Sequence, residues 1–144
     1  MTLCGEPDWC LILWQWDQFK MLARVNLNVT DAMVNPLSFQ SSMYNVSMDL
    51  CAVVTGHDTY RFYKIAPDFS NFELVHSQLM ADGQAPGQAH VSTEYSCHTW
   101  TKDTGNLVVA TEKGDIMVCN YSGEFKAYVQ ESPFGSRIVS MTAF

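Results

Sequence analysis

Residues 9 to 17 read Trp9-Cys10-Leu11-Ile12-Leu13-Trp14-Gln15-Trp16-Asp17, an almost continuous apolar stretch that holds three of the four tryptophans. An amphipathic helix would show a polar face with a period of about 3.6 residues, and a half-exposed strand would alternate polar and apolar residues. The stretch does neither, so we expect a strand that is buried on both faces. Such a strand needs further layers packed on each side of its sheet, and the rest of the chain must supply them.

The composition predicts one soluble unit and excludes several classes of partner. The chain has 144 residues, of which 47% are hydrophobic and 16% charged, so it is long enough to bury a core. Its net charge is −7 and its eight lysines and arginines are scattered, which argues against nucleic acid or an anionic membrane as a partner. No basic region of a secretory signal precedes the apolar stretch, which is too short to cross a bilayer. We therefore expect a cytoplasmic protein with reduced thiols at Cys4, Cys10, Cys51, Cys97 and Cys119.

Short strands separated by turn residues divide the chain into five expected segments. Residues 1–30 hold the last strands of a partial repeat. Residues 31–79 hold a complete repeat, whose first strand is expected at residues 32–39 and is closed by the polar Gln40-Ser41-Ser42. Residues 80–92, rich in Gly, Pro, Gln and Ala, are predicted to be a loop insertion. Residues 93–131 form another repeat, and residues 132–144 lead into the first strand of a further one, from Arg137 to Phe144.

The spacing of these segments predicts the fold class. Trp14, Tyr63 and Cys119 follow one another after 49 and 56 residues, each behind a turn that carries an aspartate. Four short antiparallel strands in each repeat are typical of a β-propeller blade, whose two faces pack on neighbouring blades. We expect an all-β, WD-type propeller fragment of about three four-stranded blades, which is not a closed ring alone because propellers close with about 4–8 blades. A complete small β-sandwich or barrel of about twelve short strands remains the alternative.

Several motifs resemble the amino-terminal propeller of an axonemal WD-repeat family, that of cilia- and flagella-associated protein 57. The resemblance spans nearly the whole chain and rests on the run from Thr2 to Asp17, on Val53-Val54-Thr55-Gly56 before Phe62-Tyr63-Lys64, on Cys97-His98-Thr99-Trp100, and on the run from Val108 to Asp115. It implies a non-enzymatic scaffold of the cilium or flagellum that helps to anchor inner dynein arms on doublet microtubules. It also implies axonemal partners, including coiled-coil components, while the incomplete set of blades predicts a chain that completes the propeller as a further partner. The family's early blades, second propeller and coiled coil have no counterpart in these residues, so functions of those parts are not carried over.

Three groups of residues are assigned expected roles. The blade core is expected to contain Trp14, Trp16, Tyr63, Trp100 and Cys119. Turn-stabilising acceptors are expected at Asp8, Asp58 and Asp115. Trp9 is expected on the other face of its strand, where its cover must come from another protein or from residues outside these 144. Candidate partner contacts are therefore Trp9 and, in the loop insertion, Asp82, Gln84 and Gln88.

No pattern in the sequence predicts catalysis, a cofactor or a bound metal. Cys97-His98, with His76 and His90 upstream, lacks the spacing of a metal site. Neighbouring residues in a strand point to opposite faces, so Cys97 and His98 cannot form a nucleophile–base pair with each other. We expect His98 to pack or to form hydrogen bonds within the first strand of its blade. The alternative function is a general intracellular WD-repeat adaptor outside cilia.

Overall fold

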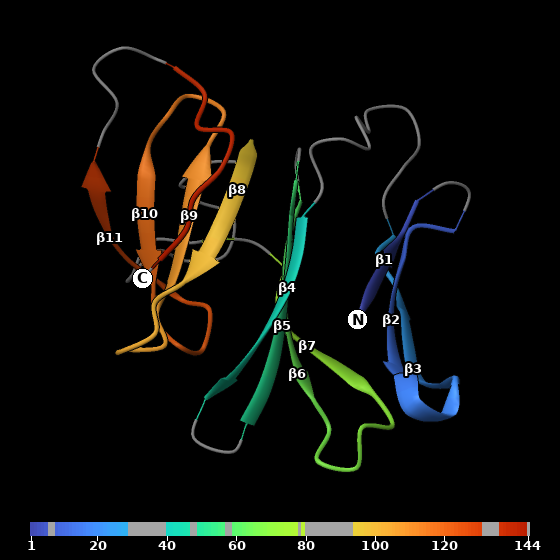
Figure 1. Cartoon of the computed structure of the whole chain (residues 1–144). Coiled ribbons are helices and arrows are strands. Elements are labelled where there is room, and N and C mark those ends of the chain that lie inside the picture. Colours follow the sequence, from blue (N-terminus) through green and yellow to red (C-terminus); the bar gives the residue numbers. More distant parts are fainter. Residues whose placement is uncertain are drawn as a thin grey trace.

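The computed structural model of the chain describes residues 1–5, 8–28, 40–46, 49–56, 59–77, 79, 94–130 and 136–143. Within these ranges the protein is all-β, with one short 3-10 helix and three separate antiparallel sheets (Figure 1). The first sheet has the order β1-β2-β3, with β1 (Thr2–Cys4), β2 (Cys10–Gln15) and β3 (Lys20–Asn26). The second has the order β4-β5-β6-β7, with β4 (Gln40–Val46), β5 (Asp49–Gly56), β6 (Thr59–Ile65) and β7 (Phe72–His76). The third has the order β11-β10-β9-β8, with β8 (Tyr95–Trp100), β9 (Leu107–Thr111), β10 (Ile116–Cys119) and β11 (Phe125–Gln130).

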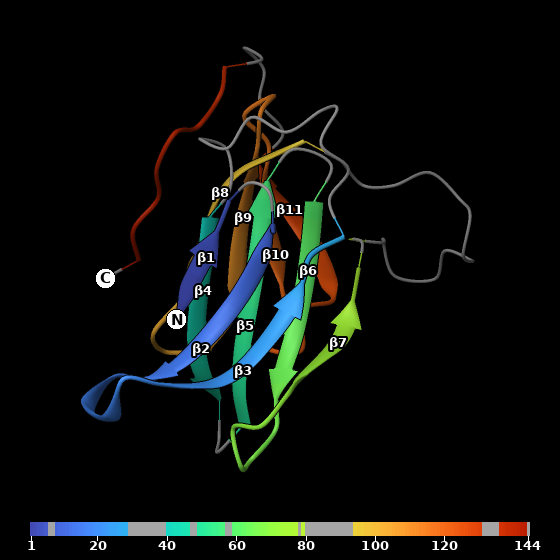
Figure 2. The same ribbon diagram turned by 90° about the vertical axis from the view of Figure 1, so that its right-hand side faces the viewer.

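The three sheets are stacked face to face, with the β4–β7 sheet in the middle (Figures 1 and 2). Cys51 and Val53 of β5 belong to the core between the middle and the third sheet. Ala52 and Val54, which alternate with them, belong to the core between the first and the middle sheet. Because both faces of the middle sheet are covered, its central strands are apolar at consecutive positions rather than alternately.

The all-β prediction is confirmed, and the barrel alternative is wrong because the sheets are open and separate. A three-layer stack also differs from a two-sheet sandwich. Two of the sheets have four strands, as expected for complete repeats, and the sheet within residues 1–30 has three.

The strand that is buried on both faces is β5 and not β2. Residues 51 to 56 are all buried, whereas Trp14 near the end of β2 is 39% exposed. The first sheet packs on the middle sheet with one face, and no described element covers the other face. Continuous apolar runs therefore occur both in β2, which belongs to an outer sheet of the stack, and in β5, which belongs to the middle sheet.

Two expected strands differ from the structure. The polar Gln40-Ser41-Ser42, expected to close a strand, instead begins β4, because its side chains form hydrogen bonds with the third sheet. The expected strand at residues 32–39 lies outside the described residues. At the other end, residues 137 to 143 form no strand. This segment runs beside the β8 edge of the third sheet (Figures 1 and 2), where Arg137 pairs with Glu112 at 2.9 Å and the Ile138 carbonyl accepts the Cys97 thiol at 3.6 Å.

Candidate interaction surface

The β2–β3 connection exposes two large aromatic side chains at one end of the stack. A single 3-10 turn, η1 (Trp16–Gln18), follows β2, and Phe19 then leads into β3. Trp16 is 81% exposed and Phe19 is 85% exposed. The backbone N–H of Phe19 donates to the carbonyl of Trp16 at 3.3 Å, which closes the turn. Burying these rings against a partner would remove a large apolar area from water.

The β6–β7 connection lies at the same end of the stack (Figures 1 and 2), and its Phe69 side chain is a third exposed ring. Asp68 Oδ1 accepts the backbone N–H of Ser70 at 3.0 Å and its hydroxyl at 2.6 Å. These hydrogen bonds hold the pKa of Asp68 below its ordinary value. The turn is therefore fixed locally, and it presents Phe69 outward. We refer to Trp16, Phe19 and Phe69 together as the aromatic end.

Both phenylalanines of the aromatic end have left-handed backbone conformations. The φ angle is 51° at Phe19 and 60° at Phe69. Bulky residues rarely adopt this region, and residues held there cost of order 1–3 kcal/mol. Strain of this kind concentrates at binding and switch sites. Two exposed rings on strained backbone at one end of the molecule therefore mark a candidate interaction surface.

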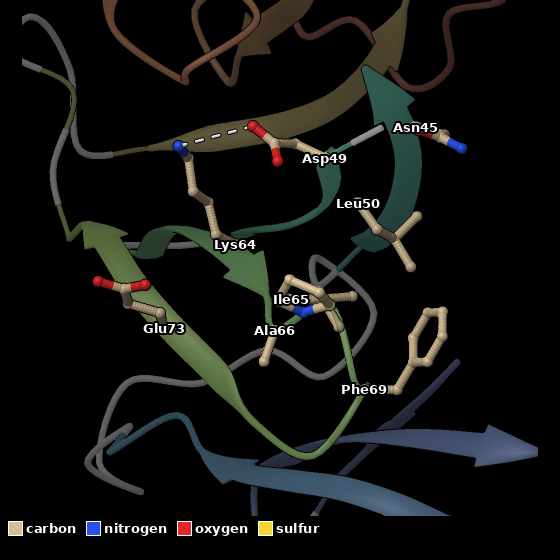
Figure 3. Close-up of a pocket in the computed structure, with 9 residues that line it drawn as sticks. Asn45, Asp49, Leu50, Lys64, Ile65, Ala66, Phe69 and Glu73 are labelled. Carbon is tan, nitrogen blue, oxygen red and sulfur yellow. Dashed lines mark ion pairs between the residues drawn. The ribbon is translucent and has the colours of Figure 1, made fainter. Parts of the chain in front are cut away.

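A small pocket lies beside Phe69 in the middle sheet. Its volume is about 280 Å³, which is just below the usual range for sites that bind small molecules. On one side Lys64 and Asp49 point toward each other, with Nζ and Oδ2 3.9 Å apart, while Phe69 lies on the opposite side (Figure 3). The lining residues are Asn45, Asp49, Leu50, Lys64, Ile65, Ala66, Pro67, Phe69 and Glu73. The pocket continues the aromatic end and could accept one side chain of a docked protein.

A polar network that joins the middle and third sheets is centred on His98. Its Nδ1 lies 2.7 Å from the Thr55 hydroxyl, and its Nε2 lies 2.7 Å from the Ser42 hydroxyl. The Trp100 indole N–H donates to the same Ser42 oxygen at 2.8 Å, and the His98 backbone N–H donates to Gln40 Oε1 at 3.3 Å. His98 is buried within β8, as expected, but the hydrogen-bond partners of its ring come from the neighbouring sheet and not from its own sheet.

The environment of His98 favours a structural role for this ring. Burial lowers the pKa of His98 to about 4, so the imidazole is neutral at pH 7. A serine next to a histidine is an arrangement used by nucleophilic enzymes. Here the imidazole is 7% exposed, and the Ser42 oxygen already accepts the indole N–H. The network therefore ties two sheets together by filling the hydrogen-bonding capacity of a buried ring.

This network predicts a pH-dependent loss of stability. The unfolded chain binds the His98 proton near pH 6.5, whereas the folded protein binds it only near pH 4. The stabilisation is therefore complete above pH 6.5, and about 3 kcal/mol of the free energy of unfolding is lost as the pH falls to about 4. Urea unfolding followed between pH 7.5 and pH 4 measures this loss.

Two variants isolate the contribution of His98 from that of the carboxylates. His98→Gln is less stable at pH 7.5 but lacks this part of the pH dependence, so its curve converges with that of the wild type toward pH 4. His76→Gln, a matched change at a half-buried histidine of β7, is measured over the same pH range to control for the loss of an imidazole. Parallel curves for wild type and His98→Gln would contradict the assignment.

Three residues expected in the blade core lie in the cores between sheets. Tyr63 is buried between the first and middle sheets, where its ring meets that of Phe72. Trp100 and Cys119 are buried between the middle and third sheets. Burial raises the pKa of Cys119 to about 12, which makes it an inert thiol.

The three tryptophans of the opening stretch have the opposite burial to that expected. Trp14 and Trp16 were assigned to the core, but they are 39% and 81% exposed. Trp9 was assigned to a partner contact, but it is 4% exposed in the core between the first and middle sheets. The reason is the orientation of the first sheet, in which Trp9, Leu11 and Leu13 face the middle sheet. β2 ends at Gln15, so Trp16 lies in the η1 turn beyond the strand.

The expected turn aspartates have different surroundings. The Asp115 carboxylate accepts the Thr111 hydroxyl at 3.3 Å, and the Thr111 hydroxyl accepts the Asp115 backbone N–H at 3.1 Å, between β9 and β10. Asp8 is exposed and pairs with Arg24 at 3.6 Å. The other assigned residues, Asp58, Asp82, Gln84 and Gln88, lie outside the described residues.

Sequence reasoning missed the aromatic end. A local signal was available in Ala66-Pro67-Asp68-Phe69-Ser70, where a large aromatic residue stands inside turn chemistry. The Asp17-Gln18-Phe19 connection has the same character. An aromatic residue at a turn position has no core to enter, so it is exposed unless another chain covers it.

Within the described ranges, no cluster of three or more histidine, cysteine, aspartate or glutamate side chains could hold a metal ion. No described helix is long and apolar enough to cross a lipid bilayer. Comparison with protein-family models and with curated proteins found no match for the chain.

Proposed function

We propose that the three sheets are successive blades of a WD-type propeller fragment and that the protein is a non-enzymatic scaffold of the ciliary or flagellar axoneme. The blade interpretation is supported by the stacking of the sheets, because a propeller blade packs both faces on its neighbours. Contacts between sheets repeat in part, since β5 contacts β8 and β1 contacts β4. If β1 is the second strand of its blade, these two contacts each join the second strand of one blade to the first strand of the next, while β4 also contacts β8 and β3 also contacts β7.

The axonemal assignment is supported by the sequence motifs, above all Cys97-His98-Thr99-Trp100 and the run from Thr2 to Asp17. Their resemblance to an axonemal WD-repeat family points to inner dynein arm bases or coiled-coil components as partners. The net charge of −7 disfavours direct binding to acidic tubulin tails, so other proteins are the expected contacts.

The observation that carries the scaffold role is the aromatic end. Trp16, Phe19 and Phe69 are exposed, and both phenylalanines are held on strained backbone. Aromatic side chains are enriched among the residues that dominate protein–protein binding energies. The partner surface is therefore expected to be apolar, with a groove that receives these rings.

The test compares the tagged chain with a Phe19→Ser, Phe69→Ser double variant in ciliated cells. The wild type is expected to co-sediment with isolated axonemes and to recover inner dynein arm components after crosslinking. The double variant is expected to recover at least about tenfold less of these components than the wild type, because each aromatic side chain buried in an interface contributes about 2 kcal/mol or more.

A matched control replaces Val139, which is 72% exposed on the C-terminal segment, with serine and is expected to bind as the wild type does. Equal recovery of all three proteins would exclude the aromatic end as the docking surface. In a different outcome, the tagged chain is absent from isolated axonemes and recovers the same partners from cells without cilia. That result would favour a general intracellular WD-repeat adaptor over an axonemal scaffold.

A further inference from the structure

Two cysteines face each other across the first hairpin of the protein. Cys4 of β1 and Cys10 of β2 are directly opposite partners in the antiparallel register. Directly opposite residues project to the same face of a sheet, with Cα atoms about 4.5–5.5 Å apart. A disulfide requires a Cα separation of about 4.4–6.8 Å. The strand register therefore places both residues within bridging range, and the Cys4 side chain is near enough to contribute to the raised pKa of Cys10.

The other three cysteines have no comparable partner in the sheets. Cys51 stands opposite Tyr44 and Lys64. Cys97 stands opposite Ala110, and Cys119 opposite Leu107 and Phe125. The juxtaposition of two cysteines is thus particular to the β1–β2 pair among the described strand pairs.

We propose that Cys4 and Cys10 form a redox-active pair that closes to an intrachain disulfide when a disulfide oxidant such as oxidised glutathione is present. This proposal concerns the hairpin alone and does not rest on the proposed axonemal function. The site is a modification site, and its product links the edge strand β1 covalently to β2.

Solvent access decides which of the two cysteines reacts with the oxidant first. Cys4 is half-buried, whereas Cys10 is 2% exposed, so the oxidant meets Cys4 first. Burial, and then the hydrogen bond and charge of Cys4, raise the pKa of Cys10, while the Arg24 guanidinium lowers it. Cys10 is therefore protected from direct attack and acts as the resolving thiol. Arg24 favours its thiolate as that second step proceeds.

The reaction is a pair of thiol–disulfide exchanges. The Cys4 thiolate attacks one sulfur of oxidised glutathione, a mixed disulfide forms on Cys4, and one glutathione thiolate leaves. The Cys10 thiolate then attacks the Cys4 sulfur, the Cys4–Cys10 bond forms, and the second glutathione thiolate leaves. The protein loses two electrons and two protons, and the oxidant takes up both as two molecules of glutathione.

The consequence falls on β1, which is an edge strand among the strands that the structure describes. β1 has three residues and is the edge strand in the order β1-β2-β3. Exposed edges are where another chain can add a strand. The disulfide holds β1 in register on β2, so oxidation fixes the edge, and reduction leaves β1 held only by its hydrogen bonds and packing.

The test measures the disulfide directly in the full chain. The protein is equilibrated in glutathione redox buffers, quenched with acid, alkylated and cleaved at Lys20, which releases a peptide with only these two cysteines. The equilibrium constant for the disulfide is expected to be at least about tenfold larger in the folded chain than in concentrated urea, or about 30 mV for this two-electron couple. An equal or smaller constant in the folded chain would overturn the proposal.

Single substitutions test the order of the two steps. Cys10→Ser should accumulate glutathione on Cys4, whereas Cys4→Ser should leave Cys10 unmodified under the same conditions. Cys97→Ser, the matched control, should form the disulfide as the wild type does. Modification of Cys51, Cys97 or Cys119 ahead of Cys4 would contradict the assignment. The same alkylation on the tagged chain in acid-quenched cells after oxidant treatment gives a second reading that needs no purification.

Discussion

Replacing Trp9 with alanine should lower the free energy of unfolding by about 3–5 kcal/mol, the range for truncating a large buried aromatic residue. Trp9 is 4% exposed and packs in the core between the first and middle sheets, in the same cluster as Leu11 and Tyr63. Truncation would leave a cavity between the first and middle sheets, and the surrounding side chains can fill it only in part. Urea unfolding at pH 7.5 measures the loss.

Trp16→Ala is the matched control, because it removes the same side chain from the same stretch. Trp16 is 81% exposed, so its truncation should change the free energy of unfolding by less than about 0.5 kcal/mol. The same variant should still weaken the docking proposed for the aromatic end. Equal losses of stability at both positions would show that the burial of the two tryptophans has been assigned wrongly.

Replacing Gly123 with alanine should destabilise the protein by about 2–5 kcal/mol, the sum of backbone strain of about 1–2 kcal/mol and overpacking of about 1–3 kcal/mol. Gly123 has a φ of 86° in the β10–β11 turn, and an added Cβ would overlap the ring of Phe62 in the middle sheet. Phe62 is fully buried and has no room to withdraw. The Tyr60 hydroxyl also donates to the Gly123 carbonyl at 2.7 Å, so this turn is fixed against the neighbouring sheet.

Gly5→Ala provides the comparison for this substitution. No atom lies within 4 Å of the position that a Cβ would take at Gly5, so the change should stay within about 0.5 kcal/mol. Thermal unfolding of the two variants beside the wild type separates the outcomes. A small effect at Gly123 would mean that the second and third sheets are not in close contact at this turn.

Much of the strand order was predictable because turns have a local chemistry. Gly105, Gly114 and Gly123 all have positive φ angles, and each stands among the polar residues that favour turns, in Asp103-Thr104-Gly105, Lys113-Gly114-Asp115 and Ser122-Gly123-Glu124. The β-branched run of β5 and the apolar run of β9 were likewise recognisable as strands. Such signals lie within a few residues of one another, so they need no knowledge of the neighbouring sheets.

The candidate surface and the polar network were not predictable in the same way. Ser42 reads as a loop residue until its distance to His98, 56 positions along the chain, is known. The exposure of Phe19 and Phe69 depends equally on where the hairpin ends lie relative to the stack (Figure 2). The polar network depends on contacts between sheets, and the exposure of the two rings depends on which parts of the stack face solvent. Neither property produces a periodic pattern in the sequence.

The opening stretch separates the two kinds of information. Residue preferences and turn positions act locally, so they were enough to predict a strand within residues 9 to 17 and an all-β chain. That Trp9 is buried while Trp14 and Trp16 are exposed could be learned only from the packing of the sheets. Burial depends on which sheet faces have a neighbour, and that is set by the stacking of layers distant in the sequence. The same stacking covers both faces of the middle sheet, whereas in the outer first sheet Cys4 stays half-buried and within reach of an oxidant while Cys10 is buried.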